Sequence, residues 1–169
     1  KDIASISPEK LKFSSYNEGE NKELETKVKI TRTPTIAILD KDGNFAGLKY
    51  SSLPSGHELN SFILGLYNVA GPGQKVSSES LEKIKKINKP INIKIGISLS
   101  CTKCPKTVQA TQRIATLNKN VEMEMINIFT FQDFKNRYDI MSVPAIIVDD
   151  QHIYFGEKTV EDMLEIINK

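Results

Sequence analysis

Apolar and polar residues alternate with period two along several short stretches, a pattern typical of β-strands with one buried face. Strands are predicted at 11–16, 35–40, 45–50, 91–97, 121–127, 145–149 and 152–155. Apolar residues recur at helical spacing elsewhere, and helices are predicted at 56–69, 77–87, 102–117, 130–138 and 159–167. Between the second and third of these strands, Lys41-Asp42-Gly43-Asn44 has the composition of a hairpin turn. The chain is therefore expected to be an α/β protein.

From residue 77 onward the predicted order is a helix followed by β-α-β-α-β-β-α. This is the order of a thioredoxin fold, in which helices on both faces bury a mixed four-stranded sheet. The first half repeats part of it, since Ile30–Ile38 matches Ile140–Val148 at an offset of 110. We therefore expect two tandem thioredoxin-like folds, 1–72 and 73–169, separated near Gly71-Pro72-Gly73. The first is expected to be redox-inactive and incomplete at its N-terminus, because it has no cysteine pair and no clear first strand.

The two cysteines of the chain, Cys101 and Cys104, lie between a predicted strand and a predicted helix in the segment Ser98–Pro105. With Cys101 at the helix N-terminus, free N–H groups and the helix dipole would stabilise its thiolate. Cys101 is then the nucleophile, and Cys104, one turn into the helix and more covered, is the resolving thiol. Two cysteines are too few for a disulfide scaffold, and this spacing favours redox or metal chemistry in a reducing, cytoplasmic setting.

The net charge of +2 hides an uneven distribution of charge. The segment 83–121 has nine Lys or Arg residues and no Asp or Glu. It is either a solvated basic face or a positive field that favours a Cys101 thiolate and attracts an acidic partner. Nucleic acid is a poorer match because the segment has no aromatic residues. No apolar run approaches the length of a membrane span, so no membrane partner is expected.

Other candidate ligands are few. The two histidines, His57 and His152, have the wrong spacing for a Cys2His2 zinc finger, so no metal is expected. The four methionines, Met141 among them, are expected to fill the core. There is no Gly-x-Gly-x-x-Gly nucleotide-binding loop.

Two prolines, Pro34 and Pro144, stand just before predicted strands. Thioredoxin-fold proteins keep a cis proline in this position, facing the cysteine pair. Pro144 is expected to be that cis proline, since a cysteine pair lies about 40 residues upstream of it. The alternative is an ordinary trans proline at a strand start.

The whole chain resembles the N-terminal region of AhpF, the flavin-containing component of alkyl hydroperoxide reductase. The segments that carry the resemblance are Leu53–Glu58, Ser98–Pro105, Thr130-Phe131-Gln132 and Val143-Pro144-Ala145. That family has two contiguous thioredoxin folds, of which only the second has cysteines. This chain differs from the family between the cysteines, where the family usually has His-Asn and this chain has Thr102-Lys103. The pKa of Cys101 and its reduction potential are therefore not inferred from the family.

The resemblance implies a thiol–disulfide oxidoreductase that passes electrons from a flavin- and NADH-using reductase portion to the disulfide of a peroxiredoxin. FAD and NADH would then belong to a separate or missing portion. It also implies that Glu58 lies near the redox centre, where it could shuttle a proton for Cys104. The alternative for Glu58 is an acid placed at a helix start by the dipole. The alternative functions are a free-standing glutaredoxin-like protein disulfide oxidoreductase and a redox-linked docking or adaptor module.

Overall fold

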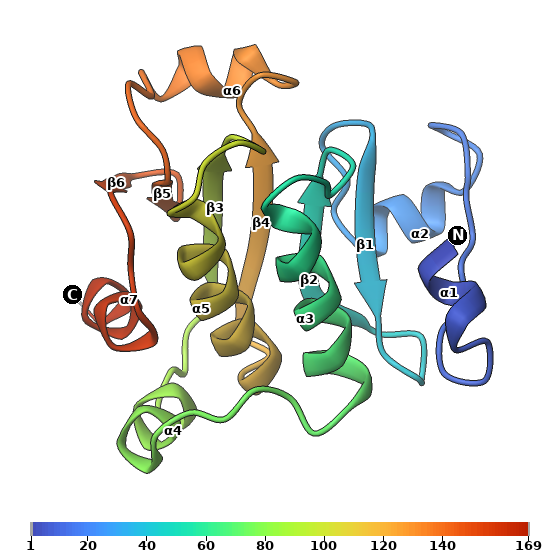
Figure 1. The fold of residues 1–169 in the computed structure, drawn as a ribbon, viewed down its shortest axis with the longest axis horizontal. Helices are drawn as coiled ribbons and strands as arrows, with labels where there is room; N and C mark the ends of the chain where they lie inside the picture. The colour runs from blue at the N-terminus through green and yellow to red at the C-terminus, as the bar shows by residue number, and fades with distance from the viewer. Residues whose placement is uncertain (1, 169) are drawn as a thin grey trace.

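The computed structural model describes residues 2–168 and contains one mixed six-stranded sheet with the strand order β1-β2-β4-β3-β5-β6 (Figure 1). The strands are β1 (Thr35–Leu39), β2 (Phe45–Ser51), β3 (Ile91–Ile97), β4 (Val121–Asn127), β5 (Ala145–Val148) and β6 (His152–Phe155). β3 pairs in parallel with β4 and antiparallel with β5, as the predicted thioredoxin order requires. The C-terminal half of the chain therefore contributes the expected set of four strands.

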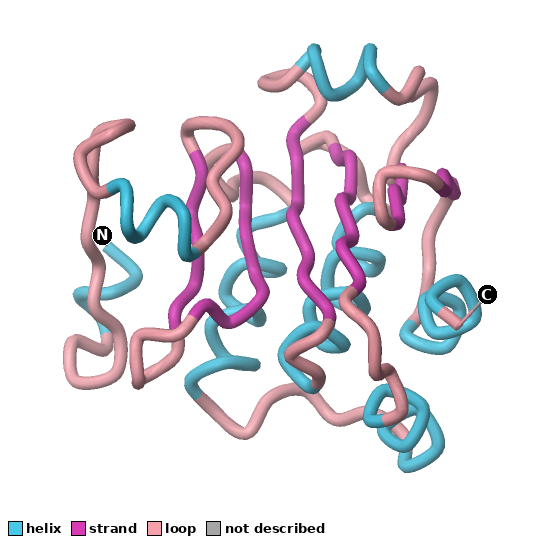
Figure 2. The backbone as a smooth tube through the Cα atoms, turned by 180° about the vertical axis from the view of Figure 1, so that it is seen from behind, coloured by secondary structure: helices cyan, strands magenta, loops and turns pink. Residues whose placement is uncertain are grey.

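Seven helices surround this sheet in the described part of the chain. They are α1 (Asp2–Ile6), α2 (Lys22–Lys27), α3 (Glu58–Ala70), α4 (Ser78–Lys85), α5 (Cys104–Leu117), α6 (Gln132–Arg137) and α7 (Val160–Ile167). Helices α3 and α5 lie side by side on one face of the sheet, and the view from behind shows the strands in front of them (Figures 1 and 2). No helix within residues 2–168 has the length and apolar character needed to cross a membrane.

The two halves join through backbone pairing rather than through a linker alone. β2 pairs in parallel with β4, with Leu48 opposite Met123 and Ser51 opposite Ile126. The sheet is therefore continuous across both halves, and the larger core cluster spans them. That cluster lies between the sheet and α3, α5 and α7, and includes Tyr50, Ile95 and Ile114. A smaller cluster around Phe134 and Ile147 covers part of the opposite face.

The internal repeat is visible in the backbone. Helices α2 and α6 have the same length and are separated by the offset of 110 seen in the sequence. After each helix, one residue has a left-handed backbone, Lys29 with φ 54° and Asp139 with φ 46°. The peptide bonds Thr33–Pro34 and Val143–Pro144 are both cis. The same loop thus leads into β1 in one half and into β5 in the other.

The predicted strand at 11–16 is wrong. This segment has no regular secondary structure, and β1 is the edge of the sheet. A strand needs a neighbour to satisfy its N–H and C=O groups, and period-two alternation alone supplies none. Phe13, which the alternation would bury beside Leu11, is about half exposed, and so is Tyr16.

Candidate redox site

Cys101 and Cys104 form a disulfide with their Cα atoms 5.5 Å apart. Cys104 is fully buried in the core between α5 and the sheet, whereas Cys101 is partly exposed. The predicted relative cover of the two sulfurs thus agrees with the structure. The predicted helix start does not: α5 begins at Cys104, so Cys101 lies before the helix and Cys104 is not one turn into it. A turn closed by the Cys101 N–H on the Ser98 carbonyl at 3.0 Å holds the chain out of the helix, and Pro105 suits the first helical turn.

The N-terminus of α5 directs one backbone donor at Cys101. The backbone N–H of Cys104 donates to Cys101 Sγ at 3.1 Å. The first turn of α5 has no acidic residue, so no carboxylate offsets the positive end of its dipole. Lys103, at the N-cap position, is exposed and its side chain makes no capping hydrogen bond. These features favour a thiolate at Cys101 once the disulfide is reduced.

The loop before β5 lies against the exposed sulfur. Cys101 Sγ is 3.9 Å from the Val143 carbonyl oxygen, and Val143 is joined to the buried Pro144 by the cis peptide bond. Val143 is the second residue before β5, and its carbonyl lies beside the partly exposed sulfur.

The N-terminal half supplies a second wall of the site. The His57 N–H donates to the Leu99 carbonyl at 3.1 Å, two residues before Cys101. Gly56, next to it, has φ +55°, and a Cβ at Gly56 would lie 2.5 Å from the same carbonyl oxygen. Only glycine fits such an approach. The half without cysteines therefore contacts the redox loop directly.

Glu58 follows this contact and is fully buried. Neither of its carboxyl oxygens has a hydrogen-bond partner. Burial raises the pKa of Glu58 to about 7, and the Ser61 hydroxyl acts in the opposite direction. A carboxyl with a pKa near 7 can give up and take back a proton at neutral pH.

The register of α3 against α5 places Glu58. The His57 N–H donates to Leu99 in the turn before Cys101, and farther along α3 the Ser61 carbonyl accepts from Gln112 Nε2 at 3.0 Å. Gln112 Oε1 in turn accepts from the Tyr50 hydroxyl at 2.8 Å. The two helices thus run in parallel, and Glu58 lies between these two contacts, level with the first turn of α5. Glu58 is therefore at the same end of this helix pair as Cys104.

Three exposed apolar side chains lie in loops at the end of the sheet where the disulfide lies. Leu53, Phe129 and Met141 follow or precede strand ends there, and their exposed fractions are 67, 66 and 83%. The prediction that Met141 fills the core is wrong: the neighbouring Ile140 is buried and Met141 points outward from the loop.

The basic segment 83–121 is less positive than its sequence suggests. Four of its nine cations form ion pairs with acids. The pairs are Lys83–Glu79, Lys85–Glu82, Lys94–Asp150 and Lys106–Glu157. This pairing favours the interpretation of a solvated face over that of a strong field. Within residues 2–168, no three His, Cys, Asp or Glu side chains are arranged to hold a metal ion.

Sequence reasoning missed the residues that support the site from the N-terminal half and from α5. Ser61, Gln109 and Gln112 have no motif that distinguishes them, and Gly56 lies in the segment Leu53–Glu58 without a role predicted for it. One signal was present, a glycine inside the helical pattern of α3. A Cβ at Gly65 would lie 2.1 Å from the Tyr50 hydroxyl, so this glycine marks a position where α3 lies close to a side chain of β2.

Comparison with protein families finds a match to the thioredoxin domain over residues 91–168. The AhpF component of alkyl hydroperoxide reductase from Staphylococcus epidermidis is 32% identical over 139 residues, which are 82% of this chain and 27% of that protein. The chain thus spans about a quarter of the length of the curated relatives that it matches.

Solved structures give a closer correspondence in extent. The N-terminal domain of AhpF from Enterococcus faecalis superposes with a TM-score of 0.93 at 36% identity, covering 98% of this chain and 79% of that chain. A protein disulfide oxidoreductase from Aeropyrum pernix superposes with a TM-score of 0.83 at 22% identity, covering 93% and 68%. The second likeness concerns the fold alone.

Proposed function

Since this chain belongs to the family of the N-terminal domain of AhpF, we propose that it relays electrons by thiol–disulfide exchange. The electrons come from a flavin- and NADH-dependent reductase portion and go to the disulfide of a peroxiredoxin. The observation that carries the proposal is the partly exposed Cys101 sulfur. It accepts a hydrogen bond from the Cys104 N–H and lies beside the Val143 carbonyl.

The exchange begins from the reduced pair. The Cys101 thiolate attacks one sulfur of the partner's disulfide, and the other partner sulfur leaves as a thiolate and is protonated. A mixed disulfide now joins Cys101 to the partner. The α5 N-terminus stabilises the negative charge on Cys101 before the attack, which favours the nucleophilic thiolate.

Cys104 resolves the mixed disulfide. Its thiol loses a proton and attacks Cys101 Sγ, which releases the partner's second thiolate and leaves the Cys101–Cys104 disulfide. In the proposal, Glu58 accepts the Cys104 proton, and it returns a proton when the disulfide is reduced again. The support for this role is a buried carboxyl whose pKa burial raises to about 7, at the level of the first turn of α5.

The apolar side chains Leu53, Phe129 and Met141 are proposed to contact the partner around its disulfide. The proposal assigns the binding of FAD and NADH to the reductase portion, and no residue described above takes part in that binding. The cytoplasm, where thiols are kept reduced, is the proposed compartment.

Trapping tests the proposal. In Cys104→Ser the mixed disulfide cannot resolve, so the partner stays joined to Cys101 and is released by a reductant for identification by mass spectrometry. Cys101→Ser/Cys104→Ser is the matched control, since it keeps the surface and lacks the nucleophile. In parallel, the reduced wild-type chain is mixed with an oxidised two-cysteine peroxiredoxin and with oxidised insulin.

Capture of a peroxiredoxin by Cys104→Ser alone, together with faster reduction of the peroxiredoxin than of insulin, supports the relay. A broad set of captured proteins and no preference for the peroxiredoxin would replace it with a general disulfide reductase. If Cys101 captures nothing and reduces neither substrate, the redox role is wrong and the chain is an adaptor.

A further inference from the structure

The buried carboxyl of Glu58 has one polar neighbour within its own helix. Ser61 lies one turn along α3 and is also fully buried. Its hydroxyl acts on the pKa of Glu58 against the effect of burial, which means that it favours the carboxylate. Because neither Glu58 oxygen has another partner, the direction of the Ser61 proton decides how well a buried negative charge is tolerated there.

The Ser61 oxygen is held from α5. Gln109 Nε2 donates to Ser61 Oγ at 3.4 Å. A serine hydroxyl has one proton to donate and lone pairs that accept. With the Gln109 amide donating to the oxygen, the Ser61 proton is directed elsewhere, and Glu58 is the neighbouring acceptor without a partner.

We propose that Gln109 orients the Ser61 hydroxyl toward the Glu58 carboxyl, so that both act as positioning residues for proton exchange with Cys104. This inference rests on the proposed function for its consequence in catalysis, whereas the Gln109–Ser61 hydrogen bond and the place of Ser61 one turn along α3 from Glu58 stand on the structure itself. Neither residue touches the reacting sulfurs, and both act through Glu58.

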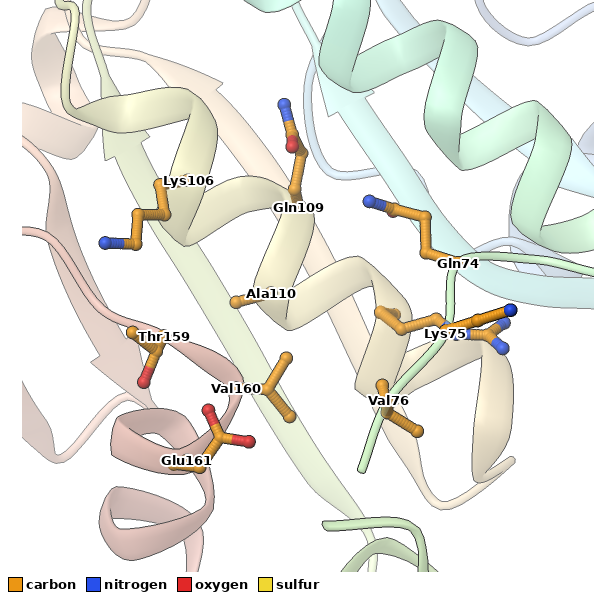
Figure 3. Close-up of a pocket in the computed structure, with 10 residues that line it drawn as sticks. Gln74, Lys75, Val76, Lys106, Gln109, Ala110, Thr159, Val160 and Glu161 are labelled. Carbon is orange, nitrogen blue, oxygen red and sulfur yellow. The ribbon is translucent and has the colours of Figure 1, made fainter. Parts of the chain in front are cut away.

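Gln109 connects this buried pair to the surface. It lines a groove of about 260 Å³ between α5, the 74–76 segment and the start of α7. Figure 3 shows its side chain leaving α5 on the side away from Thr159 and Glu161, and its contact is with α3. A substitution at Gln109 therefore changes the buried hydrogen bond from a position that is itself only half buried.

The other titratable groups near Glu58 are few. Tyr50 of β2 packs against α3, and the charge of Glu58 adds to burial in raising the pKa of its phenol. On α5 the group at the same level is Cys104, and on α3 itself His57 precedes Glu58. Lys106 and Arg113 of α5, with Lys75, line the groove; none of them is among the groups that shift Glu58.

The test measures the ionisation of Glu58 directly, by ¹³C NMR of its carboxyl carbon during a pH titration of the oxidised chain. Glu58→Gln assigns the resonance. In Ser61→Ala the pKa of Glu58 is expected to rise by about one unit, a tenfold change in its ionisation constant, because the carboxylate loses its donor. In Gln109→Ala it is expected to rise by a smaller amount in the same direction. Gln74→Ala is the matched control in the same groove, and it should leave the titration unchanged.

The rate at which dithiothreitol reduces the Cys101–Cys104 disulfide gives the second measurement. If the midpoint of its pH profile moves with the Glu58 titration in Ser61→Ala and Gln109→Ala, the inference is supported in full. If the Glu58 titration shifts in these variants but wild type and Glu58→Gln have the same pH profile of disulfide reduction, the orientation of Ser61 is supported. Glu58 then takes no part in the proposed proton transfer. An unchanged Glu58 titration in Ser61→Ala and Gln109→Ala overturns the inference, whatever the exchange rates are.

Discussion

The segment from α2 to β1 in the N-terminal half and the segment from α6 to β5 in the C-terminal half have nearly the same backbone. Each helix is followed by a hydrogen bond at the same place, Ile30 N–H to Glu25 O at 2.9 Å and Ile140 N–H to Lys135 O at 3.0 Å. A cis proline and a strand follow in both. Only the second segment lies beside a disulfide.

The two halves diverge after these strands. β2 has seven residues and pairs on both sides, whereas β6 has four and forms the sheet edge. Helix α3 is 13 residues long and α7 is eight. The longer elements of the N-terminal half bring α3 along α5, and its start reaches Leu99. The related scaffold thus supplies the sulfurs in the C-terminal half and the Glu58 carboxyl with Ser61 in the N-terminal half.

The starts of α3 and α7 show the difference at one position. Thr159 caps α7 with a reciprocal pair of hydrogen bonds to Asp162. His57 precedes α3 without a side-chain cap, and its backbone N–H goes to the redox loop instead. Helix α3 therefore lacks a stabilising cap where it contacts the site.

The largest expected effect concerns the cysteine pair, which only the C-terminal half contains. Cys101→Ser is expected to lower the rate of peroxiredoxin reduction by about a thousandfold or more, since a serine oxygen forms no disulfide. Stopped-flow measurement of thiol appearance checks this. Cys104→Ser should keep the first attack and lose turnover, and equal first-attack rates in both variants would contradict the assigned order of attack.

The next largest expected effect is the change in folding stability with pH that Glu58 of the N-terminal half causes. The pKa of Glu58 is about 7 in the folded chain, against an ordinary value of 4.5. Between these two pH values the unfolded chain releases the proton and the folded chain keeps it. Stability is therefore fully present below about pH 4.5 and falls as the pH rises through 7, by about 3 kcal/mol in total.

Urea unfolding of wild type and Glu58→Gln at pH 4, 5.5 and 8 measures this loss. The glutamine variant has no carboxyl to ionise, so the difference in unfolding free energy between the two proteins should change across that window in favour of the variant. A difference that is the same at all three pH values would mean that Glu58 has an ordinary pKa in the folded chain.

The sequence predicted the C-terminal half well because its signals are local. Strands β3, β4 and β6 have the predicted bounds, and the cysteine spacing marks Cys101 and Cys104 directly. The start of α5 was misplaced by two residues because a turn hydrogen bond from Cys101 to Ser98 competes with helix formation. Such a bond has no signature in the periodicity.

The support of the site was not predictable in the same way. The contact of Gly56 with Leu99 and that of Ser61 with Gln109 join residues more than 40 positions apart. They exist because β2 pairs with β4 and carries α3 against α5. Likewise, the outer side of α3 leaves Leu59, Ile63 and Tyr67 43–44% exposed, which the helical spacing of apolar residues at 56–69 does not indicate.

An effect of similar size tests the contact between the two halves. Gly56→Ala is expected to destabilise the chain by about 3 kcal/mol, because it adds a Cβ 2.5 Å from a backbone oxygen at a residue with φ +55°. Gly19→Ala is the matched control: Gly19 has φ +83° and no atom within 4 Å of its Cβ position, so only the backbone penalty of about 1 kcal/mol applies. Equal losses in urea unfolding would show that the Leu99 contact adds no constraint.

The smallest effect compares the two helix starts. Thr159→Ala removes the hydroxyl that accepts from the Asp162 N–H at 3.2 Å, and it should destabilise the chain by about 1 kcal/mol. His57→Ala should change stability by less than about 0.5 kcal/mol, because the side chain makes no cap and the N–H to Leu99 is a backbone group.

His57→Ser should add little stability, because the backbone at residue 57 (φ −68°, ψ −19°) is helical. A capping side chain requires the extended geometry that Thr159 has (φ −83°, ψ 176°). A His57→Ser gain as large as the Thr159→Ala loss, measured by urea unfolding at pH 5.5, would mean that α3 starts as α7 does and that its N-terminus is not committed to the redox loop.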